Sequence, residues 1–193
     1  MSRWADSLYA IIDAGTAEDP LALTKAALSS GCAMLQLRAK RLDDRAFVGL
    51  AKQVQTACRQ AGVPFVVNDR PDIARIVNAD GLHLGQDDLG VREARLVVGD
   101  MQIGVSTHDF DQATRAAREG ADLIAFGPVF ETVTKENPDP VVGTKLLRQV
   151  CGAVTLPVVA IGGITPENAG PTLAAGARFV AVISSLPHFL EKR

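Results

Sequence analysis

The chain has little that would tie it to a membrane, a nucleic acid or an oxidising compartment. Its formal net charge is -2 over 193 residues, so there is no electrostatic reason to expect a nucleic acid or an acidic membrane as a partner. Its apolar runs are strand-sized, which argues against a membrane-spanning helix, and the first residues lack a signal-peptide pattern. The three cysteines, Cys32, Cys58 and Cys151, are odd in number and widely spaced, which argues against a disulfide framework or a zinc site and indicates buried thiols. We therefore expect a cytoplasmic protein.

Runs rich in valine, isoleucine and leucine alternate with amphipathic segments along the whole chain. With 47% hydrophobic and 22% charged residues, the composition fits one globular domain over residues 1–193. Asp19-Pro20 and Thr165-Pro166 predict helix starts, and the clearest helical pattern covers residues 43–61. Glycines expected to end helices are Gly31, Gly62, Gly120 and Gly176. The predicted strands are residues 8–13, 34–38, 64–68, 81–85, 102–106, 123–127, 157–162 and 179–184.

The repeated strand–helix unit predicts an α/β fold, a single-domain (β/α)8 TIM barrel. Near-continuous apolar strands that alternate with helices belong to parallel sheets covered on both faces. A doubly wound open sheet is the alternative, because the pattern alone does not fix topology. Residues 186–193 suffice for about two helical turns, so the final helix should be short. In a barrel, functional groups are expected where the strands end at their carboxyl side.

Three polar residues alternate with apolar ones at the end of the second predicted strand. Gln36, Arg38 and Lys40 share one face because side chains alternate along a strand. A parallel barrel strand has no solvated face, so a simple solvent-facing side is a weak interpretation. Buried polar groups need partners, which favours a role for these three residues at the barrel mouth.

Acidic residues follow the third and fourth predicted strands. Asn68 and Asp69 end the third, while Asp87 and Asp88 follow the fourth. Each pair could instead cap the next helix. Taken together, carboxylates at neighbouring strand ends form a plausible magnesium site. Two aspartates would repel a bound polyanion by about 4 kcal/mol per charge pair at 4 Å, so a bridging cation would reconcile them with the nearby basic residues.

Further candidates lie after the later strands. Ser106 either faces the site or begins the next helix, and His108 is either a general base or, as we favour, a residue that caps or shields that helix. His83, inside its strand, is better explained as a hydrogen-bonded interior histidine than as a metal ligand. The long connection 127–143 is either a binding loop, in which Thr132, Thr134 and Lys135 suit phosphate oxygens, or a solvated surface loop. Further anion-binding candidates lie in the loops after the last two strands, at Gly163, Ile183 and Ser184.

These segments together resemble the thiamine-phosphate synthase family, also called thiamine-phosphate pyrophosphorylase. The motifs that carry the resemblance are QLRAK at 36–40, VNDR at 67–70, GLHLGQDD at 81–88, GVSTH at 104–108, GPVF at 127–130 with residues 132–135, IGG at 161–163 and VIS at 182–184. The resemblance implies a TIM barrel that joins 4-amino-2-methyl-5-hydroxymethylpyrimidine diphosphate to 4-methyl-5-(2-phosphooxyethyl)thiazole. It also implies small phosphorylated substrates and a homodimer.

The same resemblance assigns roles to particular residues. Asp69 and Asp88 would hold Mg²⁺, and Gln36 would lie near the pyrimidine. Thr132, Gly163 and Ser184 would hold the thiazole phosphate, with Thr134 and Ile183 beside the substrates. Residues expected to bind the diphosphate are Arg38, Lys40, Asn68, Ser106 and Lys135. All of these except Asn68 are also expected to be catalytic, because they would assist the departure of the diphosphate.

Three other functions fit parts of the pattern. A thiazole tautomerase, a relative in the same fold, would use a histidine at position 108 but typically lacks the paired aspartates. A catalytically silent barrel would bind thiazole phosphate without turnover. A generic phosphosugar enzyme would share the late phosphate site but has no need of Asp69 and Asp88. The aspartates therefore favour the synthase.

Overall fold

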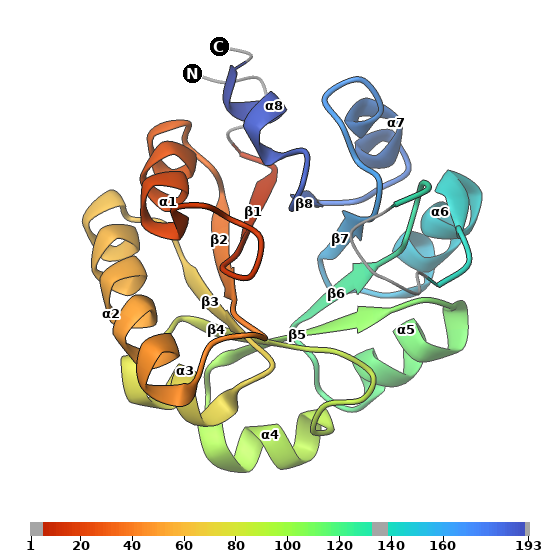
Figure 1. The fold of residues 1–193 in the computed structure, drawn as a ribbon. Coiled ribbons are helices and arrows are strands. Elements are labelled where there is room, and N and C mark those ends of the chain that lie inside the picture. The colour runs from red at the N-terminus through yellow and green to blue at the C-terminus, as the bar shows by residue number, and fades with distance from the viewer. Residues whose placement is uncertain (1–5, 133–138, 192–193) are drawn as a thin grey trace.

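The computed structural model describes residues 6–132 and 139–191, which form eight parallel strands closed into a barrel (Figure 1). The strands pair in chain order, and the eighth pairs with the first. A closed barrel removes the open-sheet alternative. The strands are β1 Leu8–Asp13, β2 Met34–Arg38, β3 Phe65–Asn68, β4 Gly81–Leu84, β5 Gln102–Thr107, β6 Leu123–Phe126, β7 Val158–Ile161 and β8 Phe179–Val182.

Helices follow the strands and form the outer layer of the barrel (Figure 1). No helix in the described ranges is long and apolar enough to cross a membrane. The final helix is short, as predicted, and buries Leu186 and Phe189 beside α1. The helices are α1 Pro20–Ser29, α2 Asp44–Ala61, α3 Pro71–Val77, α4 Val91–Val98, α5 Phe110–Arg118, α6 Gly143–Ala153, α7 Ala169–Ala174 and α8 Leu186–Glu191.

One predicted helix start is wrong. Asp19 caps α1 through hydrogen bonds from the backbone N–H groups of Leu21 and Ala22, as expected from Asp19-Pro20. Thr165-Pro166, in contrast, lies in a turn, and α7 begins only at Ala169. The physical reason is Asn168, whose side chain accepts from the Thr165 N–H and donates to the Gly163 carbonyl, so that it holds a turn where a helix was expected.

Two apolar cores hold the layers together. The larger one lies between the strands and the helices, and it includes the buried Cys32 and Cys58. The smaller one fills the barrel interior and comprises Tyr9, Ile11, Val66, Ala125, Val159 and Ala181. The barrel is therefore packed rather than hollow, as this fold requires.

The strand register brings polar residues to the same end of that interior. Asp13 pairs with Arg38, Asn68 with His83 and Ser106 with Ala125. Paired residues on adjacent parallel strands point to the same face of the sheet. Asp13, Arg38, Asn68 and Ser106 lie at or near the carboxyl ends of β1, β2, β3 and β5. The barrel mouth is thus polar above an apolar interior.

Candidate active site

Arg38 is held at the mouth by a buried acid. Its Nη1 donates to Oδ2 of Asp13, and Asp13 Oδ1 accepts from the backbone N–H of Gly15 at 2.8 Å. The Asp13 side chain is 6% exposed and that of Arg38 28%. Because these hydrogen bonds hold both the carboxylate and the guanidinium in place, the remaining Arg38 N–H groups have a fixed orientation in which they can donate to an anion.

Gln36 lies deeper in the barrel than Arg38. It is buried, and its Nε2 donates to the Tyr9 hydroxyl at 2.7 Å. Burial raises the pKa of the Tyr9 phenol well above its ordinary value, so this hydroxyl stays protonated. The pair forms a neutral polar floor beneath the charged residues.

Asp69 and Asp88 come together, as predicted from their strand ends. Burial and the adjacent Asp88 carboxylate raise the pKa of Asp69, and Lys40 opposes the shift. Lys40 Nζ lies 3.1 Å from Asp69 Oδ2. Asp69 adopts a left-handed backbone conformation, with φ of 64°, and its N–H donates to the His83 carbonyl at 2.8 Å.

Helix capping does not explain these acids. The N-cap of α3 is Arg70 and that of α4 is Gly90, and neither makes a side-chain cap hydrogen bond. Asp88 Oδ2 instead accepts from the Gly85 N–H at 2.7 Å. The capping interpretation of the two pairs is therefore wrong, because Asp69 pairs with Lys40 and Asp88 binds the Gly85 N–H instead of a helix start.

The donor set fits magnesium bound together with a substrate. No group of three or more His, Cys, Asp or Glu side chains that could hold a metal is present in the described part of the chain. Mg²⁺ commonly uses one or two carboxylates and takes its other oxygens from water and phosphates. The raised pKa of Asp69, caused by burial and by the neighbouring Asp88 carboxylate, also marks a place where a cation would relieve repulsion.

Ser106 is half-buried at the end of β5. Its Oγ lies 2.9 Å from His83 Nε2, and its backbone carbonyl accepts from Gln86 Nε2 at 2.6 Å. Burial lowers the pKa of His83 to about 4, so the ring is neutral at physiological pH. His83 is thus the hydrogen-bonded interior histidine that the sequence indicated, and Ser106 does not begin the next helix, whose N-cap is Asp109.

His108 neither caps α5 nor stands free. Its ring Nδ1 lies 2.6 Å from the Gly127 carbonyl, and its Nε2 lies 3.4 Å from Asp139 Oδ2. A ring held on both sides is oriented by the β6–α6 connection. The predicted capping role is therefore wrong, because Asp109 provides the cap.

Close backbone approach joins the connections after β6, β7 and β8. Val129 and Phe130 donate through their N–H groups to the carbonyls of Ile161 and Gly162. A Cβ at Gly163 would lie 2.2 Å from the Glu131 carbonyl oxygen, so this contact requires glycine. Ser185 Oγ donates to the Ile164 carbonyl at 2.6 Å.

The remaining predicted anion ligands divide between these connections and the undescribed segment. Gly163 follows β7, and Ile183 and Ser184 follow β8, while Thr132 follows β6. Thr134 and Lys135 lie outside the described residues. The basic and acidic residues therefore cluster after β2 to β4, and the glycine and hydroxyl residues after β6 to β8.

Asp13 and Tyr9 were missed by the sequence reasoning. Asp13 ends β1 as Asp69 follows β3, so its position at a strand end was a usable signal. Its pairing with Arg38 follows from the β1–β2 register, which the sequence does not reveal. Tyr9 gave no such signal, because a tyrosine within an apolar strand is typical of core packing.

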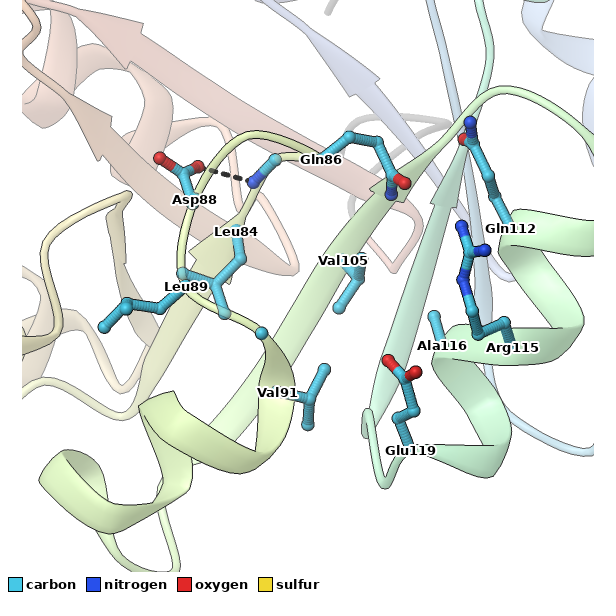
Figure 2. A pocket seen from close by; sticks show the side chains of 12 residues that line it. Leu84, Gln86, Asp88, Leu89, Val91, Val105, Gln112, Arg115, Ala116 and Glu119 are labelled. Carbon is cyan, nitrogen blue, oxygen red and sulfur yellow. Dashed lines mark hydrogen bonds between the residues drawn. The ribbon is translucent and has the colours of Figure 1, made fainter.

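A cleft of about 170 Å³ opens outside the barrel, between the β4–α4 connection and α5 (Figure 2). Leu84 and Asp88 line one side, and Arg115 and Glu119 line the other. Of the predicted site residues that the structure describes, only Asp88 borders it, and its carboxylate is engaged by the Gly85 N–H (dashed in Figure 2). Asp88 is therefore the residue that the cleft and the mouth share.

The fold and the mouth define a class: a (β/α)8-barrel protein equipped for small phosphorylated molecules. Residues 8–186 match the family described as thiamine monophosphate synthase. The chain belongs to this family.

Individual relatives agree over nearly the whole chain. It is 40% identical to a thiamine-phosphate synthase of Bacillus velezensis, over 93% of this chain and 83% of the relative. A thiamine phosphate pyrophosphorylase structure from Pyrococcus furiosus superposes with a TM-score of 0.88 at 31% identity, covering 98% of this chain and 94% of that one. An N-acetylmannosamine-6-phosphate 2-epimerase from Clostridium perfringens, with 15% identity and a TM-score of 0.72 over 93% and 87% of the two chains, shares the fold alone.

Proposed function

We propose that this protein is a thiamine-phosphate synthase. It joins 4-amino-2-methyl-5-hydroxymethylpyrimidine diphosphate to 4-methyl-5-(2-phosphooxyethyl)thiazole and releases thiamine phosphate and diphosphate. Family membership supports the reaction. The observation that carries the assignment to this mouth is the cluster in which Asp69, next to Asp88, pairs with Lys40 at 3.1 Å. A phosphosugar enzyme has no need of such a cluster.

The early strand ends would bind the diphosphate. Arg38, held by Asp13, and Lys40 supply positive charge, while Asn68 and Ser106 offer hydrogen-bond donors. Lys135 is proposed to bind the same group. Asp69 and Asp88 would hold Mg²⁺, which when bound adds positive charge against the leaving diphosphate.

The protein's contribution to the chemistry would be leaving-group stabilisation and positioning. The C–O bond to the diphosphate breaks with its electron pair on oxygen, and the thiazole nitrogen then donates its pair to the pyrimidine methylene carbon. Positive charge placed where negative charge develops is usually the largest contribution that an active site of this kind makes. Arg38, Lys40, Ser106 and Lys135 are the proposed catalytic residues, and no protein nucleophile is required.

The later strand ends would bind the other substrate. Thr132, Gly163 and Ser184 are proposed to hold the thiazole phosphate, with Thr134 and Ile183 beside the substrates. The hydrogen bonds that join the connections after β6, β7 and β8 support this, because they fix the backbone from which such contacts would be made. Gln36, at the buried floor with Tyr9, is proposed to meet the pyrimidine.

The deciding experiment incubates the purified protein with both substrates, with and without Mg²⁺, and follows coupled product by chromatography. We expect thiamine phosphate and diphosphate in equal amounts, and only with Mg²⁺. Binding of thiazole phosphate without product would instead identify a silent barrel. Isomerisation of a thiazole substrate without coupling would identify a tautomerase.

The metal role is tested by Asp69→Asn. Asparagine keeps the size and the tolerance for the left-handed backbone but removes the charge. We expect turnover to fall by about 100-fold, the scale on which loss of one transition-state contact is felt, and the Mg²⁺ concentration for half-maximal rate to rise. Steady-state rates across a Mg²⁺ titration measure both.

Asp72→Asn is the matched control. Asp72 belongs to an exposed ion pair with Arg70, so its loss should leave the rate and the Mg²⁺ dependence near those of the unmodified protein. Wild-type turnover and Mg²⁺ dependence in Asp69→Asn would remove the metal role from this residue.

A further inference from the structure

His83 has an unusual hydrogen-bonding environment in the barrel interior. The residue is 5% exposed, and the strand register places it between Asn68 of β3 and Gly104 of β5. Its Nε2 lies 2.9 Å from Ser106 Oγ. Its Nδ1 is buried and has no hydrogen-bond partner in the described ranges. Each nitrogen therefore has a different surrounding, and the two tautomers are not equivalent.

The contact with Gly104 decides which nitrogen carries the proton. A Cβ built on Gly104 would lie only 2.7 Å from His83 Nδ1, so this nitrogen faces the glycine backbone at close range. A proton on Nδ1 would point at a group that cannot accept it, and buried N–H groups without a partner are rare. A proton on Nε2 has the Ser106 oxygen as its acceptor. The geometry points to the Nε2-protonated tautomer.

This tautomer fixes the polarity of the Ser106 hydroxyl. A serine hydroxyl has one proton to donate and accepts through its lone pairs. With the His83 N–H donating to Oγ, the serine proton cannot be directed at His83 and must go elsewhere. Ser106 Oγ makes no other hydrogen bond within the described part of the chain. Its proton is therefore available to an oxygen at the mouth.

We propose that His83 is a positioning residue that makes Ser106 a dedicated hydrogen-bond donor to an anionic oxygen of the substrate diphosphate. The proposal rests on the proposed function for the identity of that anion. His83 itself would touch no substrate. His83 would affect catalysis only through Ser106. The effects of substitutions at the two positions on kcat/KM should therefore not be additive.

Two amide substitutions at position 83 test this with nearly the same chemistry. A glutamine amide nitrogen reaches the place of Nε2 and can donate to Ser106 Oγ, whereas an asparagine amide nitrogen reaches only the place of Nδ1. We expect His83→Asn to lower kcat/KM by roughly tenfold to a hundredfold, the range for one hydrogen bond to a charged group. His83→Gln should recover most of that loss.

A double-mutant cycle separates positioning from a general structural effect. In a Ser106→Ala background, His83→Asn and His83→Gln should have equal kcat/KM, because the group that His83 orients is gone. Thermal unfolding of all variants checks that they are folded. Equal activities of the two amide variants with Ser106 present would overturn the proposal.

The tautomer can be measured without any turnover. ¹⁵N-labelled protein contains three histidines, and two-bond ¹H–¹⁵N correlation spectra distinguish a protonated ring nitrogen from a bare one. We expect His83 to show a protonated Nε2 and an unprotonated Nδ1. The signals of His83 are assigned as those that are missing from the spectrum of His83→Gln. A protonated Nδ1 would overturn the proposal, even if the wild-type protein made thiamine phosphate. If it made none, the proposed function would fail, while the spectrum would still decide the tautomer.

Discussion

At the scale of single residues, two cations that the structure describes at the mouth already have partners within the chain. Arg38 is paired with the buried Asp13, and Lys40 with Asp69. The two pairs differ in burial, because Lys40 is 56% exposed whereas Asp13 is 6% exposed. An exposed pair is weak and exchanges its partner easily, but a buried acid requires its counter-charge. Lys40 is thus free to follow an arriving anion, while Arg38 stays fixed.

Asp13→Asn should destabilise the protein. The substitution leaves the Arg38 guanidinium partly buried without its counter-charge, and we expect the free energy of unfolding to fall by about 2 kcal/mol, less than for a fully buried pair because Arg38 is partly exposed. Urea denaturation measures the change. Asp44→Asn, which breaks a pair on the surface with Arg70, is the control and should cost well under 1 kcal/mol. Equal losses of unfolding free energy in the two variants would contradict the distinction between the buried and the exposed ion pair.

The residue scale is also where sequence reasoning reached its limit. Asp69 and Asp88 could be brought together in advance, because both follow successive strands of a parallel sheet. The partner of Arg38 could not, because it depends on the β1–β2 register, and a shift of one residue would turn Asp13 to the other face. The tautomer of His83 depends on Gly104, a contact that no local pattern reports.

At the scale of elements, the strands were the most predictable part. Runs rich in apolar residues predicted β1 and β2 with their observed limits, and the other strands within one or two residues. The error at α7 came from Asn168, whose side chain competes with the helix for local backbone groups. Strand limits follow from burial, whereas helix starts depend on individual hydrogen bonds.

The connection after β6 depends on a glycine that has no room for a side chain. A Cβ at Gly127 would lie 2.0 Å from the Ile161 carbonyl oxygen, which itself accepts from the Val129 N–H. We expect Gly127→Ala to force β6 and β7 apart at the mouth and to lower the free energy of unfolding by about 3 kcal/mol, as overpacking of a backbone contact does. Thermal and urea unfolding measure it.

Gly152→Ala supplies the matched control for that substitution. Gly152 lies in α6 and a Cβ there would meet nothing within 4 Å, so alanine should be neutral or stabilise by up to about 1 kcal/mol through helix propensity. A Gly127→Ala protein as stable as the Gly152→Ala protein would show that the two strand ends can separate at little cost.

At the scale of the whole molecule, the larger apolar core between strands and helices also shields two of the three thiols. Cys32 and Cys58 are buried in the outer core, and Cys151 is partly exposed. Burial raises the pKa of Cys32 to about 11 and that of Cys58 to about 12. Only the thiolate is reactive, so both residues should be inert while the barrel is closed.

Thiol labelling at pH 8 should therefore report global unfolding. We expect a disulfide reagent to react slowly with Cys151 in the native protein and with all three cysteines only when urea unfolds it. Plotted against urea concentration, the labelling of Cys32 and Cys58 should coincide with the loss of the helical circular dichroism signal. Rapid native labelling of either residue would mean that the outer layer opens locally.

The raised pKa values of Cys32 and Cys58 also determine how the free energy of unfolding changes at alkaline pH. The unfolded chain releases its thiol protons near the ordinary value of about 9, whereas the buried thiols hold theirs to higher pH. Above that value the unfolded state binds fewer protons than the native state, so stability falls as pH rises. The raised pKa of Tyr9 acts in the same direction at still higher pH.

The backbone of Asp69 restricts which side chains can occupy that position. A φ of 64° is accessible to glycine and tolerated by aspartate and asparagine, whose short polar chains can bond locally, while longer side chains pay a steric penalty there. Glutamate, the usual chemical stand-in for aspartate, would keep the negative charge but strain the bend and carry its oxygens one methylene too far. The left-handed backbone thus favours glycine, asparagine or aspartate at position 69, and of these only aspartate carries a negative charge.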